Sequence, residues 1–255
     1  MAPQLAINQH IATITLRRPR QANRLQPEDL EVIAGHIKQV NARKEVLVLR
    51  IQSSGKYFCS GYDINQIGAP AQRDVRGDAG SGFEALVNAL EDARPVTIAL
   101  IQGGVYGGAT DLALACDFRL GVPGVDMFMP AARLGLHFYQ HGLQRYVSRL
   151  GLDTAKRLFL TAEKIGAQEM RACGFLTHLV DESALNETAD TLSNTLAGMA
   201  PQALLGMKKH LNAIAHGALD VAALQADIAR AAKSANIREG ALAWSQKRAP
   251  QFTGK

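Results

Sequence analysis

The chain has 255 residues, 47% apolar and 20% charged, a composition typical of a globular protein with a sizeable buried core. Its formal net charge of +5 is compatible with an anionic partner, either nucleic acid or a small phosphorylated molecule. The lysines and arginines form no run of five or six residues, which disfavours nucleic acid.

Cysteine usage and the N-terminal sequence bear on the compartment. Cys59, Cys116 and Cys173 stand far apart, are odd in number and form no CxxC pair, so we predict neither a zinc site nor a disulfide framework. Residues 1–9 show no secretory pattern, and the longest uncharged run, 95–110, is too short and glycine-rich to cross a bilayer. We therefore expect a soluble, cytoplasmic protein without a metal.

The first half of the chain alternates predicted strands and helices. Strands are predicted at Ile11–Leu16, Val46–Ile51 and Val96–Ile101 from their alternating or β-branched apolar residues. Helices are predicted from Pro27, with Leu30, Ile33, Ala34, Ile37 and Val40 on one face, and over Phe83–Ala93. The glycine-rich segment Gly68–Gly82 is predicted to be a mobile loop. This order predicts an α/β core with parallel strand pairings.

After about Val147 the pattern becomes helical and alanine-rich, without predicted strands. The predicted helices are Val147–Leu160, Ala167–Cys173, Ala184–Met199, Pro201–His216 and Val221–Arg248. We expect this helical region to pack against another subunit.

Two glycine-rich segments follow buried strands and carry the candidate chemistry. They are Phe58–Ile64 and Gln102–Asp111, the second leading into a helical segment at Leu112–Cys116. Gly107 and Gly108 allow a ligand close to the backbone, and one N–H group from each segment would form an oxyanion hole. Both segments could instead be tight turns before packed elements. Neither is a GxGxxG or a P-loop, so nucleotide fingerprints are absent.

The order and spacing of these motifs resemble the crotonase superfamily, the enoyl-CoA hydratase/isomerase family. The matching residues extend over essentially the whole chain: Arg18-Pro19, Asn23 and Leu25; Phe58 and Ser60-Gly61-Tyr62-Asp63-Ile64; Gly103 and Gly107-Gly108-Ala109-Thr110-Asp111 on to Asp117; Arg133-Leu134-Gly135-Leu136; Leu160-Thr161, Ile165, Ala167, Gly174, Leu179 and Val180; Trp244, Lys247, Arg248 and Phe252. The resemblance implies a crotonase-like (ClpP/crotonase) spiral of ββα units with a C-terminal helical trimerisation region. It implies an acyl-CoA-binding core over 1–200 and a helical oligomerisation region over 201–255, in a homotrimer or a hexamer.

The resemblance also implies roles for particular residues. The N–H groups of Tyr62 and Gly108 match the oxyanion-hole donors, and Tyr62, Asp63, Ile64 and Asn65, with Gly107 and Gly108, match the segments that contact coenzyme A. Lys247 matches a tail lysine that reaches the phosphates of coenzyme A bound to a neighbouring subunit, and Arg20 lies near a turn that contacts coenzyme A. Coenzyme A is part of the substrate, so no separate cofactor is expected.

The acids depart from the pattern of the family's hydratases. Asp111 stands where those hydratases carry the first of two catalytic glutamates, although an acid in a helix's first turn is also favoured by the dipole alone. Ala131 occupies the position of the second, and alanine cannot transfer a proton. Nearby, His137, Tyr139 and His141 could contact the acyl group, or could be ordinary loop residues. Efficient two-acid hydration is therefore not expected.

Several functions remain open at this point. One acid and an oxyanion hole suffice for an acyl-CoA lyase or isomerase that forms a thioester enolate, and hydration is not excluded. Decarboxylation of a malonyl-type thioester needs less, and the motifs are most similar to the methylmalonyl-CoA decarboxylase branch. That branch, however, has histidine where Tyr62 stands, and its loop tyrosine aligns with Phe138. A non-catalytic homologue that binds RNA or coenzyme A is the remaining alternative.

Overall fold

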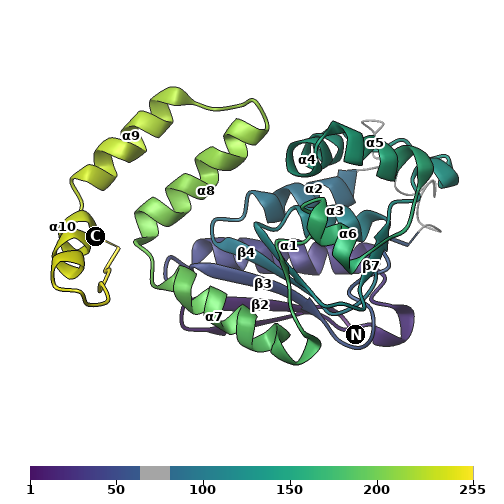
Figure 1. The fold of residues 1–255 in the computed structure, drawn as a ribbon, viewed down its shortest axis with the longest axis horizontal. Coiled ribbons are helices and arrows are strands. Elements are labelled where there is room, and N and C mark those ends of the chain that lie inside the picture. The colour runs from purple at the N-terminus through teal and green to yellow at the C-terminus, as the bar shows by residue number, and fades with distance from the viewer. Residues whose placement is uncertain (64–80, 255) are drawn as a thin grey trace.

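The computed structural model describes residues 1–63 and 81–254, and its centre is a six-stranded sheet (Figure 1). The strand order is β1-β2-β3-β4-β6-β9. The strands are β1 (Gln4–Asn8), β2 (Ile11–Leu16), β3 (Val48–Ser53), β4 (Val96–Ile101), β6 (Phe118–Gly121) and β9 (His178–Leu179). Only the β1–β2 pairing is antiparallel within this sheet. The predicted α/β core with parallel pairings is confirmed.

A second, smaller sheet lies beside the carboxyl ends of the central strands. It contains β5 (Val105–Tyr106), β7 (Asp126–Phe128) and β8 (Ile165–Gly166), in the order β5-β7-β8. The β5–β7 pairing is parallel and the β7–β8 pairing is antiparallel. Through β5, this sheet fixes the start of the helix that follows.

Helices cover both faces of the central sheet, and others extend beyond it. They are α1 (Pro27–Ala42), α2 (Ser81–Glu91), α3 (Gly108–Leu114), α4 (Gln140–Leu150), α5 (Leu152–Thr161), α6 (Ala167–Ala172), α7 (Leu185–Ala197), α8 (Pro201–Ala215), α9 (Val221–Ala232) and α10 (Ala235–Ser245). In Figure 1, α7 covers one face, while α1, α2, α3 and α4 lie on the other. On the α7 side, Arg50 of β3 donates to Ser193 Oγ at 2.8 Å and to Asp190 Oδ1 at 2.7 Å.

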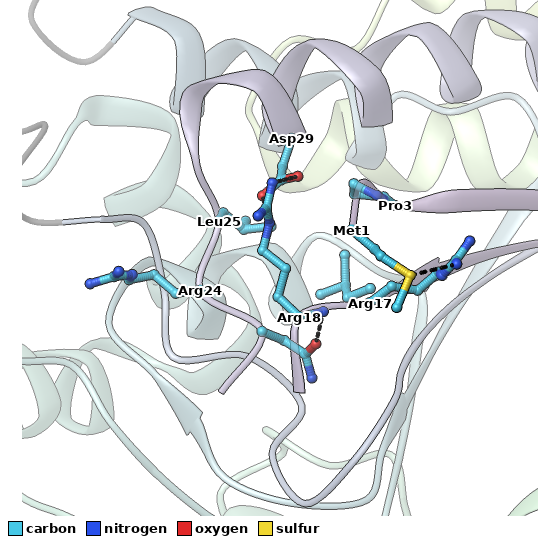
Figure 2. A pocket seen from close by; sticks show the side chains of 9 residues that line it. Met1, Pro3, Arg17, Arg18, Arg24, Leu25 and Asp29 are labelled. Carbon is cyan, nitrogen blue, oxygen red and sulfur yellow. Dashed lines mark hydrogen bonds and ion pairs between the residues drawn. The ribbon is translucent and has the colours of Figure 1, made fainter. Parts of the chain in front are cut away.

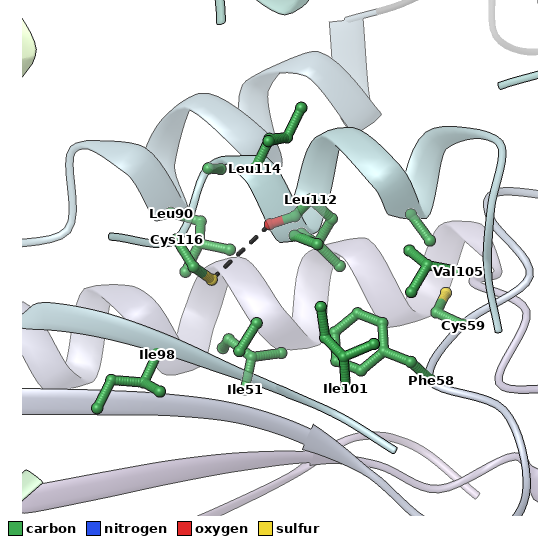
Figure 3. Close-up of a cluster of buried hydrophobic side chains, with 14 of the residues drawn as sticks. Ile51, Phe58, Cys59, Leu90, Ile98, Ile101, Val105, Leu112, Leu114 and Cys116 are labelled. Atoms are coloured by element: carbon green, nitrogen blue, oxygen red, sulfur yellow. Dashed lines mark hydrogen bonds between the residues drawn. The ribbon is translucent and has the colours of Figure 1, made fainter. Parts of the chain in front are cut away.

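The core lies between the sheet and α1, α2 and α3 (Figure 3). Ile51, Ile98 and Ile101 of the sheet face Leu90 of α2 and Leu112 of α3, and all five are almost completely buried. Because α3 is anchored by these contacts, the position of its first residue is set by the core.

The strand predictions are largely confirmed in the first half of the chain. Ile11–Leu16 and Val96–Ile101 coincide with β2 and β4, and α1 begins at Pro27. The strand predicted at Val46–Ile51 is displaced by two residues, because its ladder with β2 begins at Val48, opposite Ile11. Of the loop predicted at Gly68–Gly82, residues 68–80 lie outside the described residues, and the last two belong to α2.

The helical predictions need three corrections. The single helix predicted over Val147–Leu160 is wrong, because α4 ends before Gly151, whose positive φ of 80° starts a new helix, α5. The long helix predicted over Val221–Arg248 is also two, α9 and α10, separated at Ser234, the N-cap residue of α10. The expected absence of strands is wrong as well, since β8 and β9 are too short for an alternating pattern to reveal.

Helices α8, α9 and α10 extend to one side of the sheet and leave large apolar side chains exposed (Figure 1). Leu211 is 65% exposed and Trp244 is 88% exposed. None of the helices in the described part of the chain is long and apolar enough to cross a membrane. Whether 1–200 and 201–255 form separate functional regions stays a prediction.

A close backbone approach joins the ends of β3 and β4. The Gly104 carbonyl accepts from the amides of Phe58 at 3.1 Å and Cys59 at 3.3 Å. A Cβ atom on Gly103 would lie 1.8 Å from the Lys56 carbonyl oxygen, far inside van der Waals contact. Glycine is therefore required here for space.

We expect Gly103→Ala to destabilise the protein by about 3 kcal/mol, because the added methyl forces two rigid backbones apart. The matched control is Gly35→Ala in α1, where a Cβ meets nothing within 4 Å. That variant should gain about 0.5–1 kcal/mol from helix propensity. Free energies of unfolding from urea titrations check both values, and equal stability of the two variants would contradict the steric argument.

Candidate active site

The two predicted glycine-rich segments are brought together by the backbone. Gly61 has a positive φ of 94°, and a Cβ atom there would lie 2.8 Å from the Tyr106 carbonyl oxygen and 3.2 Å from the Gly108 nitrogen. Gly61 therefore has to be glycine, and Tyr62, the next residue, is held beside the first turn of α3. The predicted pair of amide donors, Tyr62 and Gly108, thus comes from neighbouring positions in the fold.

The start of α3 is fixed by Gly107. Its φ of 56° and ψ of −133° suit glycine, and its amide donates to the Phe128 carbonyl of β7 at 3.0 Å. Gly108 follows as the first helical residue, so its amide has no carbonyl one turn earlier to bond. Among the described residues, that amide donates to no backbone or side-chain acceptor. Its role as an oxyanion-hole donor stays a prediction.

The segment after Gly61 is tied to the start of α1. The Asp63 amide donates to the Leu25 carbonyl at 3.0 Å, and Gln26 Nε2 donates to Asp63 Oδ2 at 3.1 Å. The Tyr62 ring lies 6.0 Å from that of Phe83, measured between centroids. Ile64 and Asn65, also predicted to contact coenzyme A, lie outside the described residues.

Asp111 lies one turn into α3 and has no exposed surface. Arg145 of α4 donates through Nη1 to both carboxylate oxygens, at 2.8 Å to Oδ1 and 2.7 Å to Oδ2. The Tyr139 hydroxyl also donates to Oδ2. Burial raises the pKa of the Asp111 carboxyl above its ordinary value, against the opposing effect of Arg145 and Tyr139.

The ion pair extends into a network that joins four helices. Arg145 Nη2 donates to Glu91 Oε2 of α2 at 2.9 Å, and Arg149 and His216 also contact the Glu91 carboxylate, at 3.4 and 3.0 Å. Burial by itself would raise the pKa of Glu91, but the bond from Arg145, with Arg149 and His216, lowers it below its ordinary value. Arg145 is thus buried between two buried carboxylates, Asp111 of α3 and Glu91 of α2.

The position of the absent second acid is buried. Ala131 is 5% exposed and is the N-cap residue of the short 3₁₀ segment 132–134. Of the three predicted loop residues, only Tyr139 reaches Asp111. His137 is exposed, with Nδ1 2.8 Å from the Phe138 carbonyl oxygen, and His141 Nδ1 lies 3.0 Å from Glu84 Oε1 on the surface.

A small basic pocket lies near the start of the chain (Figure 2). Its empty volume of about 160 Å³ is below the roughly 300–1,000 Å³ of typical ligand pockets, so it does not enclose an acyl-CoA. Arg18 in this pocket is paired with Asp29 at 2.9 Å. Arg20 lies on the nearby surface, whereas Lys247 follows α10, which Figure 1 shows well away from α3. Within one chain, Lys247 therefore does not join the other candidate residues.

Arg145 and Glu91 are the site residues that sequence reasoning missed. They lie 54 residues apart, and the sequence around each of them does not distinguish a buried charged residue from a solvent-exposed one. Arg145 lies just before the helix predicted from Val147, and an arginine by itself is a weak signal because most arginines are exposed.

Comparisons with known proteins show the family of the chain. A family model described as enoyl-CoA hydratase/isomerase matches residues 6–255, and the chain belongs to that family. It is 29% identical over 255 residues to 1,2-epoxyphenylacetyl-CoA isomerase of Escherichia coli K12, covering 98% of this chain and 97% of that protein. It is 28% identical over 207 residues to short-chain-enoyl-CoA hydratase of Clostridium acetobutylicum, covering 79% and 77%.

A solved structure confirms the crotonase fold. The structure of enoyl-CoA hydratase from Bacillus anthracis has a TM-score of 0.88 and 27% identity, with complete coverage of both chains. The predicted spiral of this superfamily with its C-terminal helices is therefore confirmed.

The Glu91 network predicts a specific acid sensitivity. Because the pKa of Glu91 is lowered on folding, its contribution to stability is complete above the unfolded value of about 4.3 and is lost as pH falls through the folded value. Glu91→Gln should therefore lower the free energy of unfolding at pH 7 by about 1.5–3 kcal/mol.

The deficit of Glu91→Gln should shrink as pH falls below about 4.3, because the unfolded wild-type chain then takes up a proton at Glu91 more readily than the folded protein does. Urea titrations between pH 7 and 3 measure it, and Glu31→Gln, an exposed glutamate of α1, is the control. A deficit independent of pH would show that the ionic bonds of Glu91 are not its cause.

Proposed function

We propose that this protein transfers a proton at the α carbon of an acyl-CoA thioester, acting as a lyase or isomerase through a thioester enolate. The observation that carries the proposal is the placement of one acid, Asp111, in the helix whose first amide, Gly108, lies beside Tyr62. The relatives named above include both an isomerase and a hydratase of acyl-CoA substrates, so the family alone does not choose between these reactions.

The proposed step uses the carboxylate and the two amides together. An Asp111 oxygen lone pair forms the new O–H bond, the α C–H bond breaks, and its electron pair remains on the substrate as the enolate. The negative charge then lies on the thioester oxygen, where the Tyr62 and Gly108 amides stabilise it. The carboxylic acid returns the proton to the α carbon or to the γ carbon, and the second outcome moves a double bond.

Hydration needs more than this site provides. Adding water across a double bond by the two-acid route requires a second carboxylate, and buried Ala131 supplies none. Tyr139 is the neighbouring group that contacts Asp111, but its hydroxyl donates to the carboxylate, and burial together with Asp111 raises the pKa of Tyr139. We therefore place Tyr139 at the acyl end as a group that orients Asp111, with His137 and His141 farther out.

Substrate binding is assigned to the backbone around the two glycine segments. Tyr62, Asp63, Ile64 and Asn65, with Gly107 and Gly108, would contact the coenzyme A thioester. The net charge of +5 favours the phosphates of this anionic ligand. We infer that coenzyme A enters as part of the substrate and that the protein acts in the cytoplasm.

Decarboxylation of a malonyl-type thioester is the second candidate, and the burial of Asp111 favours it. Because the carboxyl has no exposed surface, a bound acyl group reaches it only after neighbouring side chains shift. Loss of carbon dioxide leaves its bonding electron pair on the α carbon, which becomes the enolate without help from an acid. That route needs only the two amide donors.

Incubation with a panel of acyl-CoAs in D₂O, followed by mass spectrometry, tests the proposal. Wild-type protein should introduce deuterium at the α carbon, and Asp111→Asn should slow this exchange by about 10²-fold or more while the thioester still binds. Asp153→Asn, an exposed aspartate of α5, is the matched control and should exchange at the wild-type rate.

Two results distinguish the alternatives. Release of carbon dioxide from a malonyl-type thioester that persists in Asp111→Asn would establish decarboxylation instead. Hydration of crotonyl-CoA by wild-type protein above about 10 per second would contradict the inference from Ala131.

We also infer that the protein assembles as a trimer or a pair of trimers through its C-terminal helices. Large apolar side chains on α8 and α10, including Leu211 and Trp244, are exposed in the single chain and would be covered by a neighbour. Lys247, remote from α3 in its own chain, would then lie near a neighbour's coenzyme A.

Light scattering at micromolar concentration should give a mass at least three times that of one chain. Replacing both Leu211 and Trp244 with glutamate should lower that mass, because charge is depleted from the centres of such interfaces. A wild-type monomer would refute the assembly.

A further inference from the structure

Arg145 is fully buried, and its contacts are divided between two helices. Its Nη1 bonds both oxygens of Asp111, and its Nη2 bonds Asn88 Oδ1 and Glu91 Oε2, both at 2.9 Å. A guanidinium is planar and rigid, so fixing one nitrogen between two acceptors on α2 fixes the direction of the other. The orientation of the Asp111 carboxylate is therefore set from outside α3.

The hydrogen bonds distinguish the two oxygens of Asp111. Among the described residues, Oδ2 accepts from both Arg145 and Tyr139, whereas Oδ1 accepts from Arg145 alone. A carboxylate offers about two acceptor positions on each oxygen. Oδ2 is thus filled, and Oδ1 has one position open for a proton.

We propose that Arg145 is a positioning residue for proton transfer, which holds Asp111 so that Oδ1 is the oxygen that exchanges the proton with substrate. This inference rests on the proposed function. The proton enters the open lone pair of Oδ1, and the bonds to Oδ2 persist through the step. The cation also opposes protonation of Asp111, against the burial that raises the pKa of this carboxyl.

The support for Arg145 continues to the C-terminal region. The Glu91 carboxylate that receives Nη2 is contacted by His216, directly after α8, and Asn212 of α8 donates to the Glu91 carbonyl at 3.1 Å. Arg149 contacts the same carboxylate but does not touch Asp111. This difference makes Arg149 a matched control for Arg145.

The groups that face Asp111 set the expected pH dependence. They are Arg145 of α4, Tyr139 immediately before α4, and Glu91 of α2. Removing the cation leaves burial and the charge of Glu91, both of which favour the protonated acid. The acidic limb of the exchange rate should therefore move to higher pH.

The test compares α-proton exchange in D₂O across pH for three variants and the control Arg149→Lys. Arg145→Lys keeps the charge but loses the planar guanidinium with its two Nη donors, so kcat should fall by about tenfold or more with KM nearly unchanged. Arg145→Met combined with Glu91→Gln removes the cation with one of its acids, so the acidic limb should rise by at least about one pH unit. Asn88→Ala, which leaves every charge in place, should lower kcat by a smaller factor.

If every folded variant kept the wild-type kcat and the wild-type acidic limb of the exchange-rate pH profile, the positioning role would be overturned. The proposed function would remain intact. Because Asn88 is only partly buried, Asn88→Ala keeps the test available where an Arg145 variant fails to fold. An equal shift of the limb in Arg149→Lys would also overturn it, since the effect would then not depend on contact with Asp111. Absence of exchange in wild-type protein, by contrast, would refute the proposed function itself.

Discussion

The close approach of two backbones beyond β3 and β4 is the constraint on which the candidate site depends. Parallel strands end at the same edge of a sheet, but side chains would normally keep the following loops apart. Here Gly103 accommodates the Lys56 carbonyl, and Gly61 accommodates the Tyr106 carbonyl. The amides of Tyr62 and Gly108, from distant parts of the sequence, are therefore brought close together. The geometry of the candidate site follows from the absence of side chains at these glycines.

The buried charges impose a second, opposite kind of constraint. Moving Asp111, Glu91 and Arg145 out of water is costly, and only well-formed mutual bonds offset that cost. Such a network has few satisfactory arrangements, so it specifies how α2, α3 and α4 pack as well as how the acid is oriented. One donor of this network is unsatisfied, because Arg145 Nε is buried without a hydrogen-bond partner in the described part of the chain.

The sequence was informative where the determinants are local. The apolar runs of β2 and β4, the proline at the start of α1 and the glycine segments could all be recognised from neighbouring residues, and the family resemblance supplied the fold. Prediction from the sequence failed where the determinants are far apart in the chain or where an element is only two residues long. The pairs of residues that form β8 and β9 have no period to detect, and the contact between Arg145 and Glu91 exists only after α2 and α4 pack together. Asp111 and Tyr139 were recognised as candidate site residues, but the partner Arg145 was not.

Under the proposed function, the environment of Asp111 accounts for catalysis by a single acid. Two carboxylates near one substrate must share charge and protons with each other, which suits the splitting of water. A single carboxylate held by a guanidinium has a fixed direction, which suits removal and return of one proton at one carbon. Replacing the second acid with Ala131 also removes a polar group that would need desolvation beside an apolar acyl chain. The substitution at Ala131 and the contacts of Arg145 thus favour the same chemistry, namely stabilisation of an enolate without activation of water.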